Sequence, residues 1–175
     1  MPGSDAPTVR QRLEEVLPEA READHVDVKT AQGRVGLRRF VAGMLSWSPG
    51  WMRLLFWLRG GLAKLLGLSH ADLTEGPPLR PEDVPMHPGG NIKFLTVSAA
   101  REDDFWMAEA GDRHLNGWIV VLAEPLPDGL TRFHACTVVR YRHWTGPLYF
   151  NLIRPFHHLI AAGMVKAGVR AGDVN

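Results

Sequence analysis

The sequence is poor in the residues and motifs that build several common kinds of site. Cys136 is the only cysteine among 175 residues, which excludes an internal disulfide and a metal cluster made of cysteines. So little cysteine is typical of a reducing compartment, and we expect a cytoplasmic protein. The sequence has no Gly-rich phosphate loop, no Gly-x-Ser-x-Gly elbow and no dinucleotide-binding fingerprint. These absences argue against the enzyme classes that depend on those motifs.

Long apolar runs are missing as well. The longest stretch without charge, residues 40–52, contains Pro49 and is followed by Arg53. A membrane-spanning helix needs about 20 apolar residues, so we predict no such helix. A charged segment near the N-terminus does not resemble a secretory signal. The helix predicted over residues 51–66 is basic and rich in Trp and Leu, so contact with an anionic membrane surface or with a partner protein is an alternative role.

Carboxylates are absent from two long spans, although the net charge of the chain is only +1. Residues 28–71 and 129–172 contain no Asp or Glu, and each span carries several Lys and Arg. If the two spans meet in space, they create a positive field that favours anionic partners. If they do not meet, the cations lie on separate solvated faces. The sequence leaves both arrangements open, and without a recognised module we expect no nucleic-acid partner.

The residues that are present indicate one globular domain with a short N-terminal extension. Hydrophobic residues make up 45% of the chain and charged residues 22%, as in ordinary globular proteins. We assign residues 1–23 to a tail with a short charged helix, and residues 24–175 to a single domain. Alternating side-chain character predicts strands over residues 24–30, 91–100, 104–110, 115–124 and 131–144. Short strands separated by turns favour an antiparallel sheet.

Two segments have the periodicity of helices. Residues 36–68 predict two helices separated at residues 46–50, where Ser48 and Pro49 are suited to begin a helix. After the last strand and a turn at residues 144–147, the period changes from two to between three and four. This second segment predicts a long terminal helix with one apolar face, so it needs a sheet to lie on. The apolar face is formed by Tyr149, Leu152, Ile153, Phe156, Leu159, Ile160, Gly163 and Ala167.

Four local motifs accompany this order of elements. They are Ser46-Trp-Ser-Pro-Gly-Trp51 with Leu58-Arg59, Gly111-Asp-Arg-His-Leu115, Gly146-Pro-Leu-Tyr149 and Arg154-Pro-Phe-His157. The order of elements resembles the helix-grip fold of the START-like (SRPBCC) superfamily. The motifs are similar to those of an uncharacterised bacterial family within it, the domain of unknown function 2867. The resemblance, over residues 24–170, implies an α+β fold in which a curved antiparallel sheet wraps around a long C-terminal helix, with two shorter helices after the first strand.

The same resemblance implies an apolar cavity between the sheet and the terminal helix. We therefore expect binding of an apolar or amphipathic small molecule, anionic molecules included, with no cofactor. On the last strand, Phe133, Thr137 and Tyr141 share a face that is suited to line this cavity. The opposite face of this strand carries Arg132, His134, Arg140 and Arg142, and we expect it to be solvated. We chose the Trp118 face of the preceding strand for its bulk, since the sequence does not decide between the two faces. The residues expected to contact the ligand are His114, Trp118, Phe133, Thr137, Tyr141, Tyr149, Phe156 and His157.

An enzyme of the cyclase, dehydratase or hydrolase kind, acting in the same cavity, is the alternative. His157, Tyr149 or His114 would then serve as a general acid or base. The simpler interpretation of His157 is a hydrogen bond that fixes the helix to the sheet, while His158 is expected to point away. We expect no metal site among the eight histidines, because zinc needs three or four converging ligands. The oligomeric state stays open.

Overall fold

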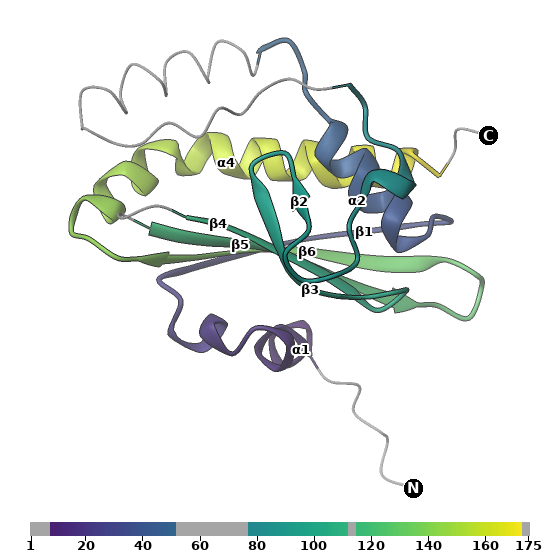
Figure 1. Ribbon diagram of the computed structural model, residues 1–175, viewed down its shortest axis with the longest axis horizontal. Coiled ribbons are helices and arrows are strands. Elements are labelled where there is room, and N and C mark those ends of the chain that lie inside the picture. The colour runs from purple at the N-terminus through teal and green to yellow at the C-terminus, as the bar shows by residue number, and fades with distance from the viewer. Residues whose placement is uncertain (1–7, 52–76, 112–114, 173–175) are drawn as a thin grey trace, which may run out of the picture.

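An antiparallel sheet with helices on both of its faces forms the centre of the protein (Figure 1). The computed structural model describes residues 8–51, 77–111 and 115–172. Within these ranges the sheet has six strands in the order β1-β6-β5-β4-β3-β2, and every neighbouring pair is antiparallel. The strands are β1 (His25–Gly33), β2 (Asn91–Ile92), β3 (Leu95–Arg101), β4 (Phe105–Gly111), β5 (Leu115–Pro125) and β6 (Thr131–Tyr141). The predicted α+β class with an antiparallel sheet is confirmed.

The strands follow the alternating pattern of the sequence, with one difference. Residues 91–100, expected as one strand, are divided into β2 and β3 by a tight turn at Lys93, whose φ is 53°. The Nζ atom of Lys93 donates to the carbonyl oxygen of Leu45 at 2.6 Å, near the end of a helix. Burial lowers the pKa of this amine. A short irregularity in the pairing of β3 with β4 lies between Val97 and Ala99.

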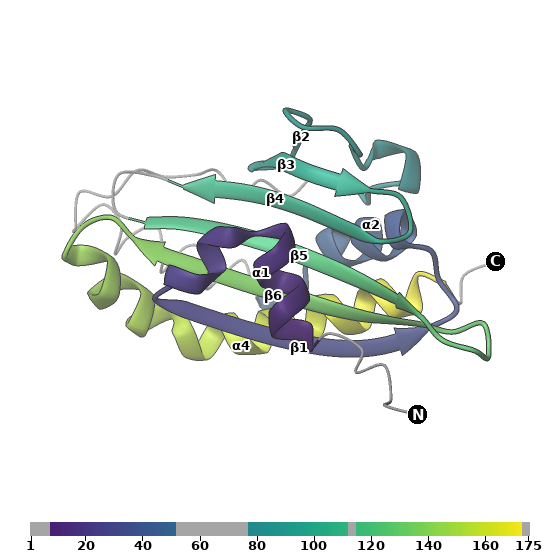
Figure 2. The ribbon, with the colours of Figure 1, turned by 90° about the horizontal axis from the view of Figure 1, so that it is seen from below.

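One face of the sheet is covered by the N-terminal helix α1 (Val9–Val16) and the short 3-10 helix η1 (Pro18–Glu22), as Figure 2 shows from below. Thr8 and Gln11 form a capping box that begins α1. The buried cluster on this face joins Leu13, Leu17 and Ala20 to side chains of three strands. Those sheet residues are Phe105, Met107, Trp118, Val120, Leu122, Cys136 and Val138.

The β6 face that carries Arg132 and His134 was expected to be solvated, and this prediction was wrong in its centre. His134 is buried at 7% exposure, and Cys136 beside it is buried at 1%. The His134 ring lies 2.9 Å from the hydroxyl of Thr30 through Nδ1 and 3.5 Å from Glu124 through Nε2. The expectation failed because it did not consider that α1 packs on this face of the sheet.

The opposite face carries helices α2 (Leu37–Ser46) and α4 (Thr145–Arg170), with the 3-10 helix η2 (Pro81–Asp83) beside α2. Phe40 of α2 stacks on Phe133 of β6, with ring centroids 4.1 Å apart and planes 10° apart. Apart from Trp51, the helix predicted over residues 51–66 lies outside the described residues. In the part of the chain that the structure describes, no helix is long and apolar enough to cross a membrane.

Helices α2 and α4 approach each other closely because glycines lie where they cross. A Cβ atom at Gly168 of α4 would lie 2.8 Å from the Phe40 ring and 2.9 Å from the Phe40 carbonyl oxygen. A Cβ atom at Gly43 of α2 would lie 2.6 Å from the Cβ of Ala171. Such distances leave no room for a side chain at either position, so the C-terminal half of α4 is held against α2.

We therefore expect Gly168→Ala to destabilise the protein by about 1–3 kcal/mol, since the new methyl group must displace backbone as well as a ring. Urea unfolding followed by circular dichroism measures this change. Gly50→Ala is a matched control, because a Cβ there meets no atom within 4 Å. Equal free energies of unfolding for the two variants would contradict the close helix contact.

Candidate functional site

A group of polar side chains lies between β1 and the N-terminal half of α4. His25, Asp27 and Lys29 occupy every second position of β1, so they share the sheet face that α4 covers. Lys29 Nζ donates to Asp27 Oδ1 at 2.8 Å. Nδ1 of His158 lies 3.3 Å from the same oxygen and 3.4 Å from Lys29 Nζ. One carboxylate oxygen is thus held by a lysine of its own strand and a histidine of the facing helix.

The histidine rings of this group lie close to one another and to the ring of Phe150. The His25 ring lies 4.8 Å from that of Phe150, between centroids, and 6.0 Å from that of His158. The His157 ring lies 6.0 Å from Phe150 and 6.1 Å from His158. We call His25, Asp27, Lys29, His157 and His158 the β1–α4 polar cluster.

Three atoms of the β1–α4 polar cluster are buried without a hydrogen-bond partner in the described structure. They are His25 Nε2, Asp27 Oδ2 and His157 Nε2. Buried polar atoms nearly always have a partner, and an unsatisfied one costs about 1–3 kcal/mol. Three such atoms in one cluster therefore mark a place where the protein has hydrogen-bonding capacity that its own packing does not use.

Burial and charge set the protonation of the cluster. Burial lowers the pKa of His157, and the nearby His158, His25 and Lys29 lower it further against the opposing effect of Asp27. Burial also lowers the pKa of His25, with Arg154 of α4 as the next cause. For Asp27, burial alone would raise the pKa, but the hydrogen bond and charge of Lys29, followed by the charges of His158 and His157, lower it overall. The cluster thus favours an ionised Asp27 beside uncharged His25 and His157 rings.

An apolar strip beside the polar cluster is only partly buried. Thr137 of β6 lies directly opposite Asp27 of β1 and opposite Ile119 of β5, so all three share the α4 face. Ile119 and Thr137 are half-buried, as are Ala135 and Gly117. We call Gly117, Ile119, Ala135 and Thr137 the accessible strip.

The neighbouring regions of the sheet are packed more tightly than the accessible strip. On the α1 face, Val120 and Val138 are completely buried. Farther along the α4 face, Val121 and Phe133 are completely buried in the cluster that includes α2. On the α4 face, the sheet is thus sealed where α2 packs on it and only partly buried at the accessible strip, next to the β1–α4 polar cluster.

Three of the residues predicted to bind a ligand lie at this site. Thr137 belongs to the accessible strip and His157 to the polar cluster. Tyr141 lies at the end of β6 with its ring 6.1 Å from that of Phe150, and burial, followed by the charge of Asp24, raises its pKa. Phe133 is on the same face, but it is completely buried beneath Phe40.

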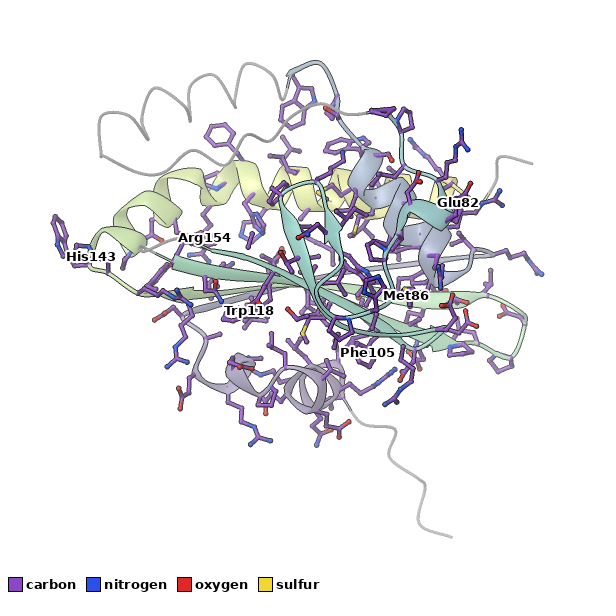
Figure 3. All side chains as sticks on the ribbon, in the orientation of Figure 1. Glu82, Met86, Phe105, Trp118, His143 and Arg154 are labelled. Atoms are coloured by element: carbon purple, nitrogen blue, oxygen red, sulfur yellow. The ribbon has the colours of Figure 1, made fainter. Side chains whose placement is uncertain are left out.

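Three predictions of side-chain direction were wrong. Trp118 lies on the α1 face with 7% exposure, and Figure 3 shows it across the sheet from Arg154 of α4. Phe156 is 46% exposed and Leu159 of the same predicted stripe is 58% exposed, whereas Phe150 and Val165 of α4 are buried. His158 points to Asp27, not away from the sheet.

His114 and the side chain of Tyr149, which were also predicted to contact the ligand, lie outside the described residues.

The sequence-based prediction missed His25, Asp27, Lys29, Phe150 and Arg154. Their signal was the alternation of β1, which places His25, Asp27 and Lys29 on one face. A strand face made of polar and charged residues suggests exposure to solvent, and only the structure shows that α4 covers it. The strand and the helix also bring the two spans without carboxylates together, since Lys29 of the first span contacts His158 of the second.

The polar cluster does not have the arrangement of a metal centre. Within the described ranges, no group of three or more His, Cys, Asp or Glu side chains is placed to hold a metal ion. Its chemistry is that of hydrogen bonding and proton transfer by uncharged rings next to a carboxylate.

The fold and the site together define a class of α+β protein in which a C-terminal helix lies on an open antiparallel sheet and a polar cluster lies between the two. Within that class, the chain belongs to the family described as "Protein of unknown function (DUF2867)", whose model matches residues 19–164. This finding confirms the family resemblance of the four sequence motifs. No curated protein matches the chain.

Because the pKa of His157 is lowered in the folded chain, protonation of this ring in acid favours unfolding. Its contribution to stability is complete above its ordinary pKa of 6.5 and is lost as the pH falls toward the lowered value. We expect His157→Gln to reduce the fall in the free energy of unfolding between about pH 7 and about pH 5. Urea unfolding at each pH measures the slope. Identical slopes for the wild-type protein and the variant below pH 6.5 would contradict the burial of an uncharged ring.

Proposed function

We propose that the protein binds an apolar or amphipathic small molecule between the sheet and α4. The observation that carries this proposal is the accessible strip, whose residues face α4 and yet remain half-buried. Helix-facing residues in the middle of a sheet are normally sealed by close packing. A partly accessible surface of small and apolar side chains is suited to contact the apolar body of a ligand.

The polar cluster at one end of the strip favours an amphipathic ligand. Ligand sites are mostly apolar with a few placed polar groups, and Asp27, His25 and His157 supply such groups here. Lys29 and Arg154 add positive charge at the same end, which keeps anionic molecules within the proposal. Thr137, Tyr141 and His157 are the residues predicted from sequence that this ligand would contact.

The protein should therefore carry a small molecule through purification, which native mass spectrometry and mass analysis of an organic extract will detect. Thr137→Phe places a ring in the accessible strip, so we expect the variant to lose at least about nine-tenths of that molecule while remaining folded. Val28→Phe is the matched control, because Val28 is on the opposite face of β1 and is 39% exposed. This control should retain the molecule.

The melting temperature separates ligand binding from ordinary packing. A ring added to a solidly packed core costs about 1–3 kcal/mol. If Thr137→Phe lowers the melting temperature far more than Val28→Phe does, and if the wild-type protein carries no small molecule, the strip is part of a filled core. That pair of results would refute the proposed binding site.

An enzyme that acts on the bound molecule is the second candidate, and one contact favours it. Asp27 Oδ1 faces Nδ1 of His158, the arrangement in which a carboxylate orients a histidine as a general base. A base of this kind would serve cyclisation, dehydration or hydrolysis, the reaction classes expected from the sequence. The role proposed for the helix over residues 51–66, contact with a membrane surface or a partner, concerns a segment outside the described residues.

If the site is catalytic, the small molecules extracted from the wild-type protein should change on incubation, as followed by mass analysis. His158→Gln should then slow the conversion by about 10²-fold or more, since general-base catalysis contributes that much. Rates are compared per bound molecule, because His158 also contacts Asp27 of the binding site. Conversion at the same rate in the variant would remove His158 from the reaction.

A further inference from the structure

We propose that the β1–α4 polar cluster recognises a hydroxyl group, so that the ligand is an alcohol or a phenol with an apolar body. The hydroxyl would donate its proton to Asp27 and accept a hydrogen bond from His157. This inference depends on the proposed function, because it names the head group of the molecule in that site.

Asp27 requires a ligand that donates a hydrogen bond. Its Oδ1 atom is engaged by Lys29 at 2.8 Å and by His158 at 3.3 Å, and its side chain is only 10% exposed. Its Oδ2 atom is buried without a partner in the described structure. A carboxylate oxygen only accepts hydrogen bonds. A carboxylate head group has no proton to offer and would leave Oδ2 unpaired beside a like charge.

The two histidines favour a group that both donates and accepts. Burial favours the uncharged ring at His25 and His157, and the Nε2 atom of an uncharged ring donates or accepts according to its tautomer. A hydroxyl that donates its single proton to Asp27 still has lone pairs that accept a hydrogen bond from the tautomer with a proton on Nε2. An ammonium group only donates, and it would bring another positive charge near Lys29 and Arg154.

The register of the sheet places an apolar surface next to this polar end. Thr137 lies beside Asp27 in the pairing of β1 with β6, and Ile119 lies beside Thr137 in the next pair. Gly117 and Ala135 flank this row on the same face. A molecule with its hydroxyl at Asp27 would therefore lay its body across β6 and β5, under α4.

Calorimetric titration with four compounds that share one alkyl tail tests the assignment. They are 1-decanol, 1-methoxydecane, decanoate and decylammonium, measured below their aggregation limits near neutral pH. The methyl ether accepts hydrogen bonds but cannot donate one. Since a hydrogen bond to a charged group contributes more than a neutral one, we expect 1-decanol to bind about ten-fold more tightly than the ether. We also expect it to bind more tightly than either ion.

Two variants assign the donor and acceptor roles separately. Asp27→Asn removes the charged acceptor, so the ratio of alcohol to ether affinity should fall by at least about three-fold while decanoate gains affinity. His157→Phe keeps a ring of similar size but removes the Nε2 atom, so alcohol and ether should both weaken and their ratio should stay unchanged. Val28→Phe, on the other face of β1, should alter none of the affinities.

The possible outcomes separate the two proposals. If decanoate, decylammonium or the ether equals the alcohol in the wild-type protein, the hydroxyl assignment is wrong and the binding site stands. If no compound binds and the purified protein carries no small molecule, the proposed function fails and this inference fails with it. Should Asp27→Asn not fold, the four wild-type affinities still decide the question.

Discussion

The contact between α2 and α4 is the constraint on which the rest of the structure depends. Gly43 and Gly168 allow the two helices to approach so closely that a side chain at either position would collide with backbone or with Cβ atoms. This contact fixes the C-terminal half of α4 and, through the stack of Phe40 on Phe133, ties both helices to β6. The N-terminal half of α4 has no such partner among the described residues, and it lies over β1 with histidines in between. One end of the helix–sheet interface is thus densely packed and apolar, and the other is polar and partly accessible.

The polar end is an unfavourable arrangement for stability alone. An ionised Asp27 is held away from water, and only one of its oxygens has partners in the described structure. Removing charges from water costs several kcal/mol unless hydrogen bonds compensate fully, and apolar replacements of similar size often stabilise such sites. Lys29 and His158 compensate for part of this cost. The remaining unsatisfied atoms are concentrated next to the accessible strip, and local conflicts of this kind are expected at functional sites more than in structural cores.

Patterns within the sequence predicted the positions of the strands and helices well. They predicted poorly which side of each element packs against which other element. Alternation located five of the strands to within a few residues, because a strand with one covered face must alternate. It could not show that both faces of β5 are covered, since Trp118 and Ile119 are each suited to a core. On α4, the spacing of the apolar residues favoured Phe156, but Phe150 is the ring that is buried against the sheet. The direction of the His158 side chain depends on its contact with Asp27. Asp27 is distant in the sequence, and the residues around it do not indicate this contact. Motifs identified the family, but the contacts of the site arise only when β1 pairs with β6 and α4 crosses them.

Cys136 gives the α1 face a property of its own. Its thiol is buried beneath α1, and burial raises its pKa to about 12, so in the closed structure it is almost entirely protonated and shielded. Thiol reagents attack the thiolate, which forms readily only after α1 lifts from the sheet and water reaches the sulfur. Because Cys136 is the only cysteine in the chain, the rate of alkylation would measure how often this one position becomes exposed. Alkylation of Cys136 would therefore report on any opening of the N-terminal helix, on the side of the sheet opposite α4.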